Sequence, residues 1–275
     1  MDAPEIRAEI VEHYEHDYDE ARRISGGFGE LELVRTREII RRHLPPGYLR
    51  VLDVGGGTGV HAQWLAEDGH RVVVVDPMPR HVVAARALAE GGLAVEAELG
   101  DSRRLIQGDA SVDVVLLLGP LYHLTDRVDR MSAWRESLRV VRPGGLVFAA
   151  GISRFASLFD GLARGWCSDP EYRVVVEQDL RDGQHRNPER RPHWFATAYF
   201  HHPDELEAEA AEAGAERVEL VGIEGLAGWL PHLGREWADP AGRETILDSA
   251  RLVESERSLI GLSAHLLLVA RRRTT

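Results

Sequence analysis

The chain has 275 residues, of which 44% are hydrophobic and 28% are charged, and its formal net charge is −12. A chain of this length can bury a sizeable core and form one large domain, with or without a cap. The acidic balance argues against a nucleic-acid substrate, because nucleic-acid binding usually needs basic patches. The single cysteine, Cys167, excludes an intrachain disulfide and a cysteine-rich zinc site.

The basic residues are all arginines, since the sequence contains no lysine. This excludes both a P-loop lysine and a Schiff-base lysine. No apolar run reaches about 18 residues, so no membrane span is expected. The first residues are acidic and lack the apolar core of a signal peptide, so we expect a cytoplasmic protein.

Helix and strand patterns alternate along most of the chain. Apolar periodicity predicts helices over 5–24 and 30–44, separated by the glycine-rich break 26–29. Alternation of this kind predicts a parallel sheet with helices on both faces, whose ligands bind beyond the carboxyl ends of the strands. The next expected elements are strands at 50–54, 71–75, 93–98, 112–118 and 145–151, and helices at 59–68, 79–90 and 127–141.

Two stretches interrupt this alternation. Residues 153–202 have no regular period, and a long insertion at this edge of a sheet is typical of a lid or substrate cap. A second excursion covers 224–258. We therefore expect an N-terminal helical segment at 1–45, a core at 46–152 and 203–275, and a cap at 153–202. The later core elements are a helix at 203–213 and strands at 217–223 and 265–270, and the second excursion carries a helix at 240–254.

The most informative segment runs from Val51 to Gly59. An apolar strand leads into three alternating glycines and then into a helix, in the pattern D-x-G-x-G-x-G. Glycine adopts positive φ without a Cβ clash, so the chain can turn tightly and a ligand can approach the backbone. The helix start directs free N–H groups toward that ligand. A dinucleotide-binding G-x-G-x-x-G would need its last glycine at Val60, which disfavours a nicotinamide cofactor.

Several segments, in this order, resemble the class I S-adenosylmethionine-dependent methyltransferases. Asp53–Gly59 resembles the family's first motif, and the strand 71–75 ends at Asp76, where the family places the acid that binds the ribose. Three further segments resemble the adenine-contacting segment, the fourth strand and the turn before the fifth strand. They are Gly100–Ser102, Val112–Gly119 and Arg142–Gly145.

This resemblance implies a doubly wound α/β fold of the Rossmann-like methyltransferase type. Its sheet is mainly parallel and seven-stranded, with helices on both faces and a helical cap insertion. The implied cofactor is S-adenosylmethionine, with S-adenosylhomocysteine as product, and the segment 1–45 closes over it. The expected cofactor-binding residues are Tyr14, Tyr18, Arg35, Asp53, Gly55, Gly57, Gly59, Asp76, Pro77, Met78, Gly100, Asp101, Ser102, Leu118 and Gly119.

Methyl transfer from a sulfonium is an in-line displacement, so the protein mainly has to align the acceptor and exclude water. His123 is the candidate general base, because its loop resembles the one beside the methyl group and histidine titrates near neutral pH. Its alternative role is to pack against the cofactor loop. Aromatic and polar side chains suit a small organic acceptor. The expected acceptor-binding residues are Tyr122, Trp166, His185, Arg186, Trp194, Tyr199 and His201.

No metal is expected, because His201 and His202 lack the H-x-x-x-H or H-E-x-x-H spacing of a helical metal site. The sequence therefore predicts a methyltransferase acting on an oxygen or nitrogen, less favourably a carbon, of a small molecule. Neither nucleic acid nor membrane is an expected partner, and a homodimer is open. Two alternatives remain: an NAD(P)-dependent oxidoreductase, and a cofactor-binding protein of the same fold that moves no methyl group, such as a cyclase or pseudo-enzyme.

Overall fold

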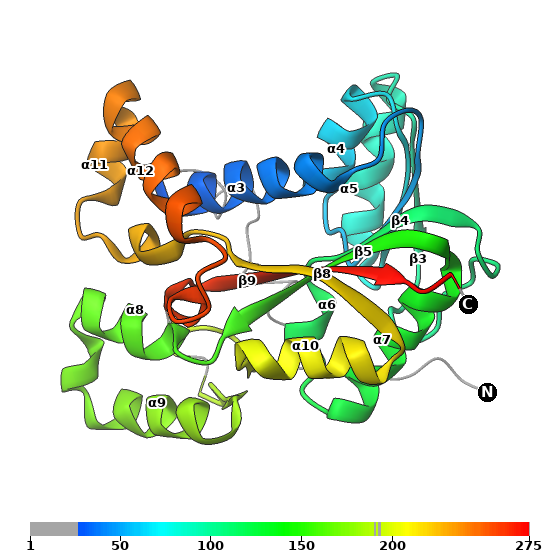
Figure 1. Cartoon of the computed structure of the whole chain (residues 1–275). Coiled ribbons are helices and arrows are strands. Elements are labelled where there is room, and N and C mark those ends of the chain that lie inside the picture. The colour runs from blue at the N-terminus through cyan, green and yellow to red at the C-terminus, as the bar shows by residue number, and fades with distance from the viewer. Residues whose placement is uncertain (1–26, 190, 192–193, 275) are drawn as a thin grey trace.

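The computed structural model describes residues 27–189, 191 and 194–274, and Figure 1 shows its course. The predicted helix at 5–24, with Tyr14 and Tyr18, lies outside the described residues. The first half of the described chain contains α3 (Gly27–His43), β1 (Arg50–Val54), α4 (Val60–Glu67), β2 (Arg71–Asp76), α5 (Pro79–Glu90), β3 (Val95–Leu99), β4 (Val112–Leu117), α6 (Pro120–His123) and α7 (Arg127–Val140).

The second half contains the cap and the end of the sheet. Its elements are β5 (Val141–Ser153), α8 (Ala156–Arg164), η2 (Trp166–Ser168), α9 (Pro170–Asp182), β6 (Gln184–His185), β7 (Ala198–His201), α10 (Pro203–Glu212), β8 (Ala215–Gly222), η3 (Gly225–Trp229), α11 (Leu233–Ala238), α12 (Pro240–Val253), η4 (Ile260–Leu262) and β9 (His265–Arg272). We find no helix among the described residues that combines the length and the apolar character needed to cross a bilayer.

The sheet has the predicted doubly wound, mainly parallel form. Its main strands follow the order β3-β2-β1-β4-β5-β9-β8, and β9 runs antiparallel between β5 and β8. Two short cap strands extend it, since β7 joins the end of β5 and β6 pairs with β7. Because β9 is reversed, its first residue, His265, lies opposite Ile152 near the carboxyl end of β5. The amino end of β9 and the carboxyl ends of the parallel strands thus share one edge.

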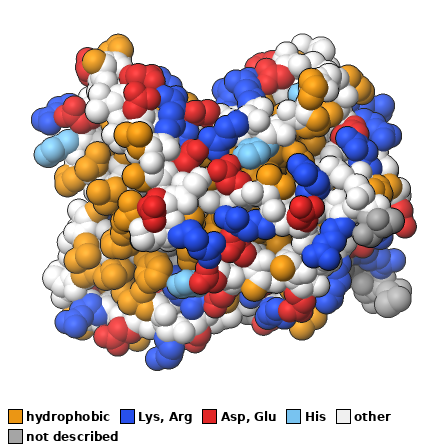
Figure 2. Space-filling model, viewed as in Figure 1, with side chains coloured by type: hydrophobic (Ala, Val, Ile, Leu, Met, Phe, Trp, Pro, Cys, Tyr) orange, Lys and Arg blue, Asp and Glu red, His pale blue; other side chains and the backbone are white. Residues whose placement is uncertain are grey.

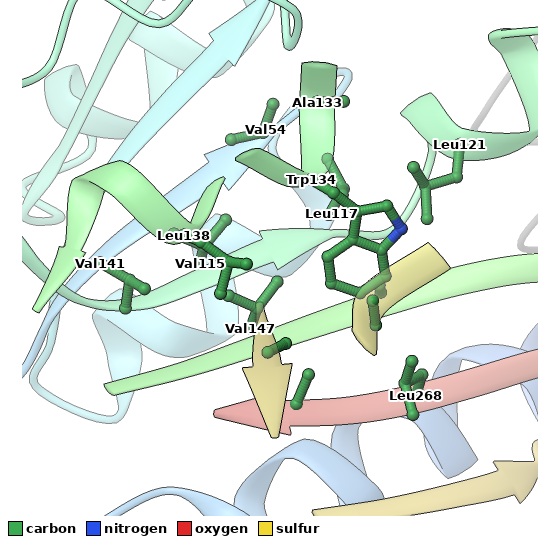
Figure 3. Packing of buried hydrophobic residues seen from close by; sticks show 14 of the residues in the cluster. Val54, Val115, Leu117, Leu121, Ala133, Trp134, Leu138, Val141, Val147 and Leu268 are labelled. Atoms are coloured by element: carbon green, nitrogen blue, oxygen red, sulfur yellow. The ribbon is translucent and has the colours of Figure 1, made fainter. Parts of the chain in front are cut away.

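Helices cover both faces of this sheet, with α3, α4 and α5 on one side and α7 and α10 on the other (Figure 1). Successive side chains of a strand point to opposite faces, so a strand buried on both sides is apolar throughout. In β4, Val115 and Leu117 belong to one buried cluster, whereas Val114 and Leu116 belong to the other. Figure 3 shows the first cluster around Trp134 of α7, which is wholly buried.

Two predicted boundaries are wrong for identifiable reasons. The glycines at 27 and 29 do not break the chain but lie in the first turn of α3. A Cβ on Gly27 would lie 2.9 Å from Cα of Gly234, so glycine permits α3 to approach α11 closely. The segment Arg142–Gly145 is not a separate turn but belongs to β5, where the pairing with β4 shifts register. A Cβ on Gly145 would meet the carbonyl oxygen of Asp113 at 2.6 Å.

A buried polar network joins the cap strand β7 to helices α7 and α10. Arg130 of α7 bonds to Glu209 of α10 through Nε at 2.9 Å, and donates to the carbonyl oxygens of Leu124 and Thr125. Its guanidinium carbon lies 3.5 Å from the ring centroid of Tyr199. Burial raises the pKa of the Glu209 carboxyl, but bonds with His201 and Arg130 outweigh this and lower it below its ordinary value.

Candidate active site

One cavity of about 280 Å³ lies at the carboxyl edge of the sheet. It is bounded by the loops after β1, β2, β3 and β4 and by one face of α3, and it extends to the start of β9. Its described lining includes Gly29, Glu32, Leu33, Thr36, Asp53, Gly55, Gly57, Asp76, Pro77, Met78, Gly100, Asp101, Ser102, Leu118, Gly119, Tyr122, His123, Ile223 and His265.

The excursions extend past the same edge of the sheet, α8 and α9 from one side and α11 and α12 from the other (Figure 1). Figure 2 shows hydrophobic side chains gathered over α8 and α11. Leu162 on α8 and Leu226 on η3 are exposed large apolar side chains. The cavity edge is therefore flanked by apolar surface.

The glycine motif forms a tight bend between β1 and α4. Gly55, Gly57 and Gly59 have φ of +68°, +56° and +90°, a region that other residues rarely adopt. Gly56 has no room for a side chain either, because a Cβ would lie 2.5 Å from Oδ2 of Asp53. The motif thus brings bare backbone to the cavity wall, as its sequence predicts.

We expect Gly55→Ala to lower the free energy of unfolding by about 2–4 kcal/mol, combining left-handed strain and overpacking. Its Cβ would lie 2.7 Å from Cγ of Pro120, a ring carbon that cannot turn away. Gly47→Ala is the matched control, because Gly47 has φ of +96° but nothing within 4 Å of a Cβ. Urea unfolding followed by circular dichroism separates the strain from the clash. Equal losses in the two variants would contradict a tight Gly55–Pro120 contact.

Asp76 is buried at the end of β2 and joins two walls of the cavity. Its Oδ2 accepts a hydrogen bond from the backbone N–H of Gly57 at 2.9 Å. Its Oδ1 accepts one from the N–H of Met78 at 2.9 Å and lies 3.0 Å from Nδ1 of His81. A carboxylate offers about four lone-pair sites, so these three partners leave capacity for one more donor.

Asp101 lies in the cavity wall after β3, but its carboxylate is largely committed to a neighbour. Arg103 donates to Oδ1 through its backbone N–H and Nε, and to Oδ2 through Nη2. Arg103 also reaches Asp129 at 3.0 Å. These three donors leave one acceptor site on Asp101, as on Asp76, for the expected cofactor contact.

Two predicted cofactor contacts are not in the cavity wall. Arg35 is fully buried and donates to the carbonyl oxygen of Ile223 and to the carboxylates of Glu38 and Glu254. Arg35 therefore fastens α3 to the second excursion and lies outside the lining of this cavity. Gly59 lies outside the cavity lining as well. It is the N-cap residue directly before α4, and a Cβ there would meet the side chain of Leu88 at 2.8 Å.

Six of the seven expected acceptor-binding residues lie outside the lining of this cavity, and several of them pack against one another or against neighbouring side chains. His185 bonds to Asp179 at 2.7 Å and stacks on Phe200. Trp166 and Trp194 both pack edge-on against Tyr172. Within the described structure, Trp166, His185, Arg186, Trp194, Tyr199 and His201 are all absent from the cavity lining.

Tyr122 and His123 do reach the cavity. They lie on the short helix α6, and their rings are 4.7 Å apart between centroids. Gly119 precedes this helix, and a Cβ there would lie 3.4 Å from the carbonyl oxygen of Gly55. The loop after β4 is thus packed directly on the glycine bend.

Sequence reasoning missed three chemical groups in this region, Glu32, Glu224 and His265. They offer ligand-capable atoms that all lie within 4.8 Å of one another. Glu224 follows β8 and His265 begins β9, so the reversed direction of β9 brings both to the ligand edge. A histidine at the first position of a final antiparallel strand is the signal that could have identified this group.

Comparison with known proteins places this architecture in a family. The family model "Methyltransferase domain" matches residues 51–145. A ubiquinone biosynthesis O-methyltransferase of Azorhizobium caulinodans is 30% identical over 79% of this chain and 70% of its own length. The enzyme of the same name from Methylocella silvestris is 38% identical over 40% of this chain, and the match spans only 43% of that relative.

A solved structure supports the same fold. A methyltransferase of Methanosarcina mazei, described as S-adenosylmethionine-dependent, superimposes with a TM-score of 0.59 and 17% identity. The superposition covers 86% of this chain and 98% of that one. The chain belongs to the class I S-adenosylmethionine-dependent methyltransferases, a family of transferases whose cofactor is S-adenosylmethionine.

Proposed function

We propose that this protein transfers the methyl group of S-adenosylmethionine to an oxygen of a small organic molecule bound in the cavity. The proposal depends on the bend at Gly55 and Gly57, where the backbone is exposed in the wall of the cavity. Asp76 lines the same cavity. The names of the two relatives, ubiquinone biosynthesis O-methyltransferases, favour oxygen over nitrogen as the acceptor atom.

The residues present fit an adenosyl amino acid. Gly55 and Gly57 have positive φ, which favours glycine, so no side chain stands between the loop and the ligand. Asp76 keeps one acceptor site for a ribose hydroxyl. Met78, buried at 4% exposure, gives an apolar surface for a flat base. We assign Asp53, Gly55, Gly57, Asp76, Pro77, Met78, Gly100, Asp101, Ser102, Leu118 and Gly119 to this contact.

The cofactor supplies a methyl carbon bonded to a positively charged sulfur, which is already a good leaving group. An acceptor hydroxyl forms the new O–C bond, the S–C bond breaks with its electron pair on sulfur, and the hydroxyl proton must leave. The protein's contribution is to align the oxygen and keep water out, which can supply about 7–11 kcal/mol of the barrier. We assign the acceptor contact to Tyr122 and His123, which line the cavity beside the glycine bend.

Calorimetric titration with S-adenosylhomocysteine and with NADH tests the cofactor. We expect the thioether to bind and the nicotinamide nucleotide not to bind. Incubation with isotope-labelled S-adenosylmethionine and separate samples of catechol, phenol and benzylamine then tests the acceptor class. Methylation of the amine alone would exclude oxygen as the acceptor, and NADH binding without thioether binding would overturn the proposal.

His123→Ala is expected to reduce methyl transfer to catechol while leaving the affinity for S-adenosylhomocysteine nearly unchanged. The reason is that His123 lines the cavity beside Tyr122, and these are the two residues that we assign to the acceptor. A general acid or base typically contributes about 10²–10⁴-fold, and a residue that only orders the acceptor contributes less. Steady-state turnover with an accompanying calorimetric titration measures both quantities. Unchanged turnover would remove His123 from the site.

A further inference from the structure

We propose that Glu224 and His265 form a carboxylate–imidazole dyad that removes the acceptor proton. This inference rests on the proposed methyl transfer and adds to it the group that accepts the proton. His265 begins β9 and lines the cavity, and Glu224 lies directly before η3. Nδ1 of His265 is 2.5 Å from Oε1 of Glu224.

The carboxylate of Glu224 is held in one position. It has no exposed surface, and its Oε2 accepts hydrogen bonds from Oγ of Ser263 at 2.7 Å and from the backbone N–H of His265 at 3.0 Å. The N–H groups of Glu224 and Gly225 donate in turn to Oγ of Ser263. This network holds the carboxylate so that Oε1 points toward Nδ1 of the imidazole.

This arrangement determines the tautomer of His265. Burial raises the pKa of the Glu224 carboxyl, but the neighbouring imidazole and the bonds from Ser263 and His265 outweigh it and lower that pKa. The group is therefore an acceptor, and Nδ1 must donate to it. The lone pair of the neutral ring then resides on Nε2, as a general base requires.

Exposure to the cavity distinguishes this pair from other histidine–glutamate pairs in the described chain. The His265 side chain is 18% exposed and packs beside Phe28 of α3. His201 is also paired with a glutamate, Glu209, but has no exposed surface. His43 pairs with Glu219 at 2.8 Å and is likewise 18% exposed, but it lies outside the cavity lining.

The proton step balances within this site. As the acceptor oxygen forms its bond to the methyl carbon, its hydroxyl proton passes to Nε2 of His265, and the S–C electron pair goes to sulfur. The products are a methyl ether, a neutral thioether and an imidazolium whose charge faces the Glu224 carboxylate. The imidazolium later returns its proton to water. Among the described residues, the charged groups that lie with it are Glu224 and Glu32 of α3.

The same groups suggest a competing role as cation ligands, because Glu32 joins Glu224 and His265 within 4.8 Å. The observations favour the dyad, since Oε1 of Glu224 is already engaged by Nδ1 and Oε2 by two other donors. These three donors leave Glu224 one acceptor site for a cation. The experiment below includes a test for that outcome.

The experiment compares full-length wild type with His265→Gln and Glu224→Gln, using His43→Gln and Glu219→Gln as matched controls. Turnover of catechol is measured from pH 5 to 9 (about one unit or more on each side of the ordinary histidine value), and S-adenosylhomocysteine affinity is measured by calorimetry. We expect His265→Gln to lower kcat about 10²–10⁴-fold with little change in affinity. The controls should keep wild-type kcat.

Glu224 is a positioning residue, so its variant has a separate signature. Glu224→Gln should lower kcat about 10–100-fold. It should also move the acidic limb of the pH–rate profile to lower pH, because the neutral amide no longer stabilises the positive charge of the imidazolium. A merely structural residue would lower kcat without moving that limb. Nitrogen-15 spectra of histidine-labelled wild type supply a test that needs no variant, with the proton of neutral His265 expected on Nδ1.

Three results would overturn the dyad: wild-type kcat in His265→Gln, a proton on Nε2 of His265, or activity that EDTA abolishes and Mg²⁺ restores. Failure of the proposed function is distinguishable, because the wild-type protein itself would then leave S-adenosylhomocysteine unbound or catechol unmethylated. The nitrogen-15 spectra report on the Glu224–His265 bond in either case.

Discussion

Replacing Arg130 by methionine is expected to lower the free energy of unfolding by about 3–5 kcal/mol. The substitution leaves the Glu209 carboxylate, which is 4% exposed, without its guanidinium partner. It also removes the donor to the carbonyl oxygens of Leu124 and Thr125 and the cation over Tyr199. A buried charge that loses its partner cannot recover the solvation it lost on folding, so the effect is large.

The same two helices supply the control. Arg127 of α7 pairs with Glu212 of α10, but both side chains are about half exposed. Arg127→Met should change the unfolding free energy little, because solvent screens an exposed pair. The double variant Arg130→Met/Glu209→Leu should regain most of the stability lost in the single variant, since no unpaired charge remains. Urea unfolding measures all three, and equal losses for Arg127→Met and Arg130→Met would contradict the role of burial.

Asp76→Ala is expected to weaken S-adenosylhomocysteine binding at least about 100-fold, which corresponds to about 3 kcal/mol. Two effects combine. The variant loses the acceptor proposed for the ribose, and it releases the N–H groups of Gly57 and Met78, which the carboxylate holds at 2.9 Å each. Asp76→Asn should give a smaller loss, because one amide oxygen can still accept.

Calorimetry on folded variants provides the measurement, with thermal melting as a check on their integrity. Asp68→Ala is the control, because Asp68 pairs with Arg41 near the end of α4, outside the cavity. Its affinity should equal that of the wild type. If Asp76→Ala also kept wild-type affinity, the nucleoside would have to lie elsewhere than at the end of β2.

The sequence predicted most of the sheet because burial on both faces leaves a direct pattern. The run Val72–Val75 of β2 and the alternating clusters of β4 are apolar for that reason. The glycine bend was also predictable, because positive φ restricts the residue type. By contrast, Gly27 is glycine because α11 lies against it, a contact between distant segments that no local pattern reveals.

The cap illustrates why the acceptor contacts could not be predicted. Its aromatic and histidine residues resemble a binding pocket by composition, yet His185 and Trp194 pack with Phe200 and Tyr172 inside the cap. Buried polar side chains need partners whether or not a ligand is nearby, so composition alone does not separate the two uses. The Glu224–His265 pair was missed for the opposite reason, since its residues are 41 positions apart and meet only through the direction of β9.

The anchoring of α3 restricts how the cavity can open. Arg35 ties this helix to Ile223 and Glu254, and Gly27 rests against Gly234. If α3 moved outward alone, the buried guanidinium of Arg35 would lose the Glu254 carboxylate and the carbonyl oxygen of Ile223, and this cost makes such a movement rare. Helix α3, which lines one side of the cavity, therefore moves together with the second excursion. Ligands have to enter where the cavity is bordered by segments that lack such an anchor.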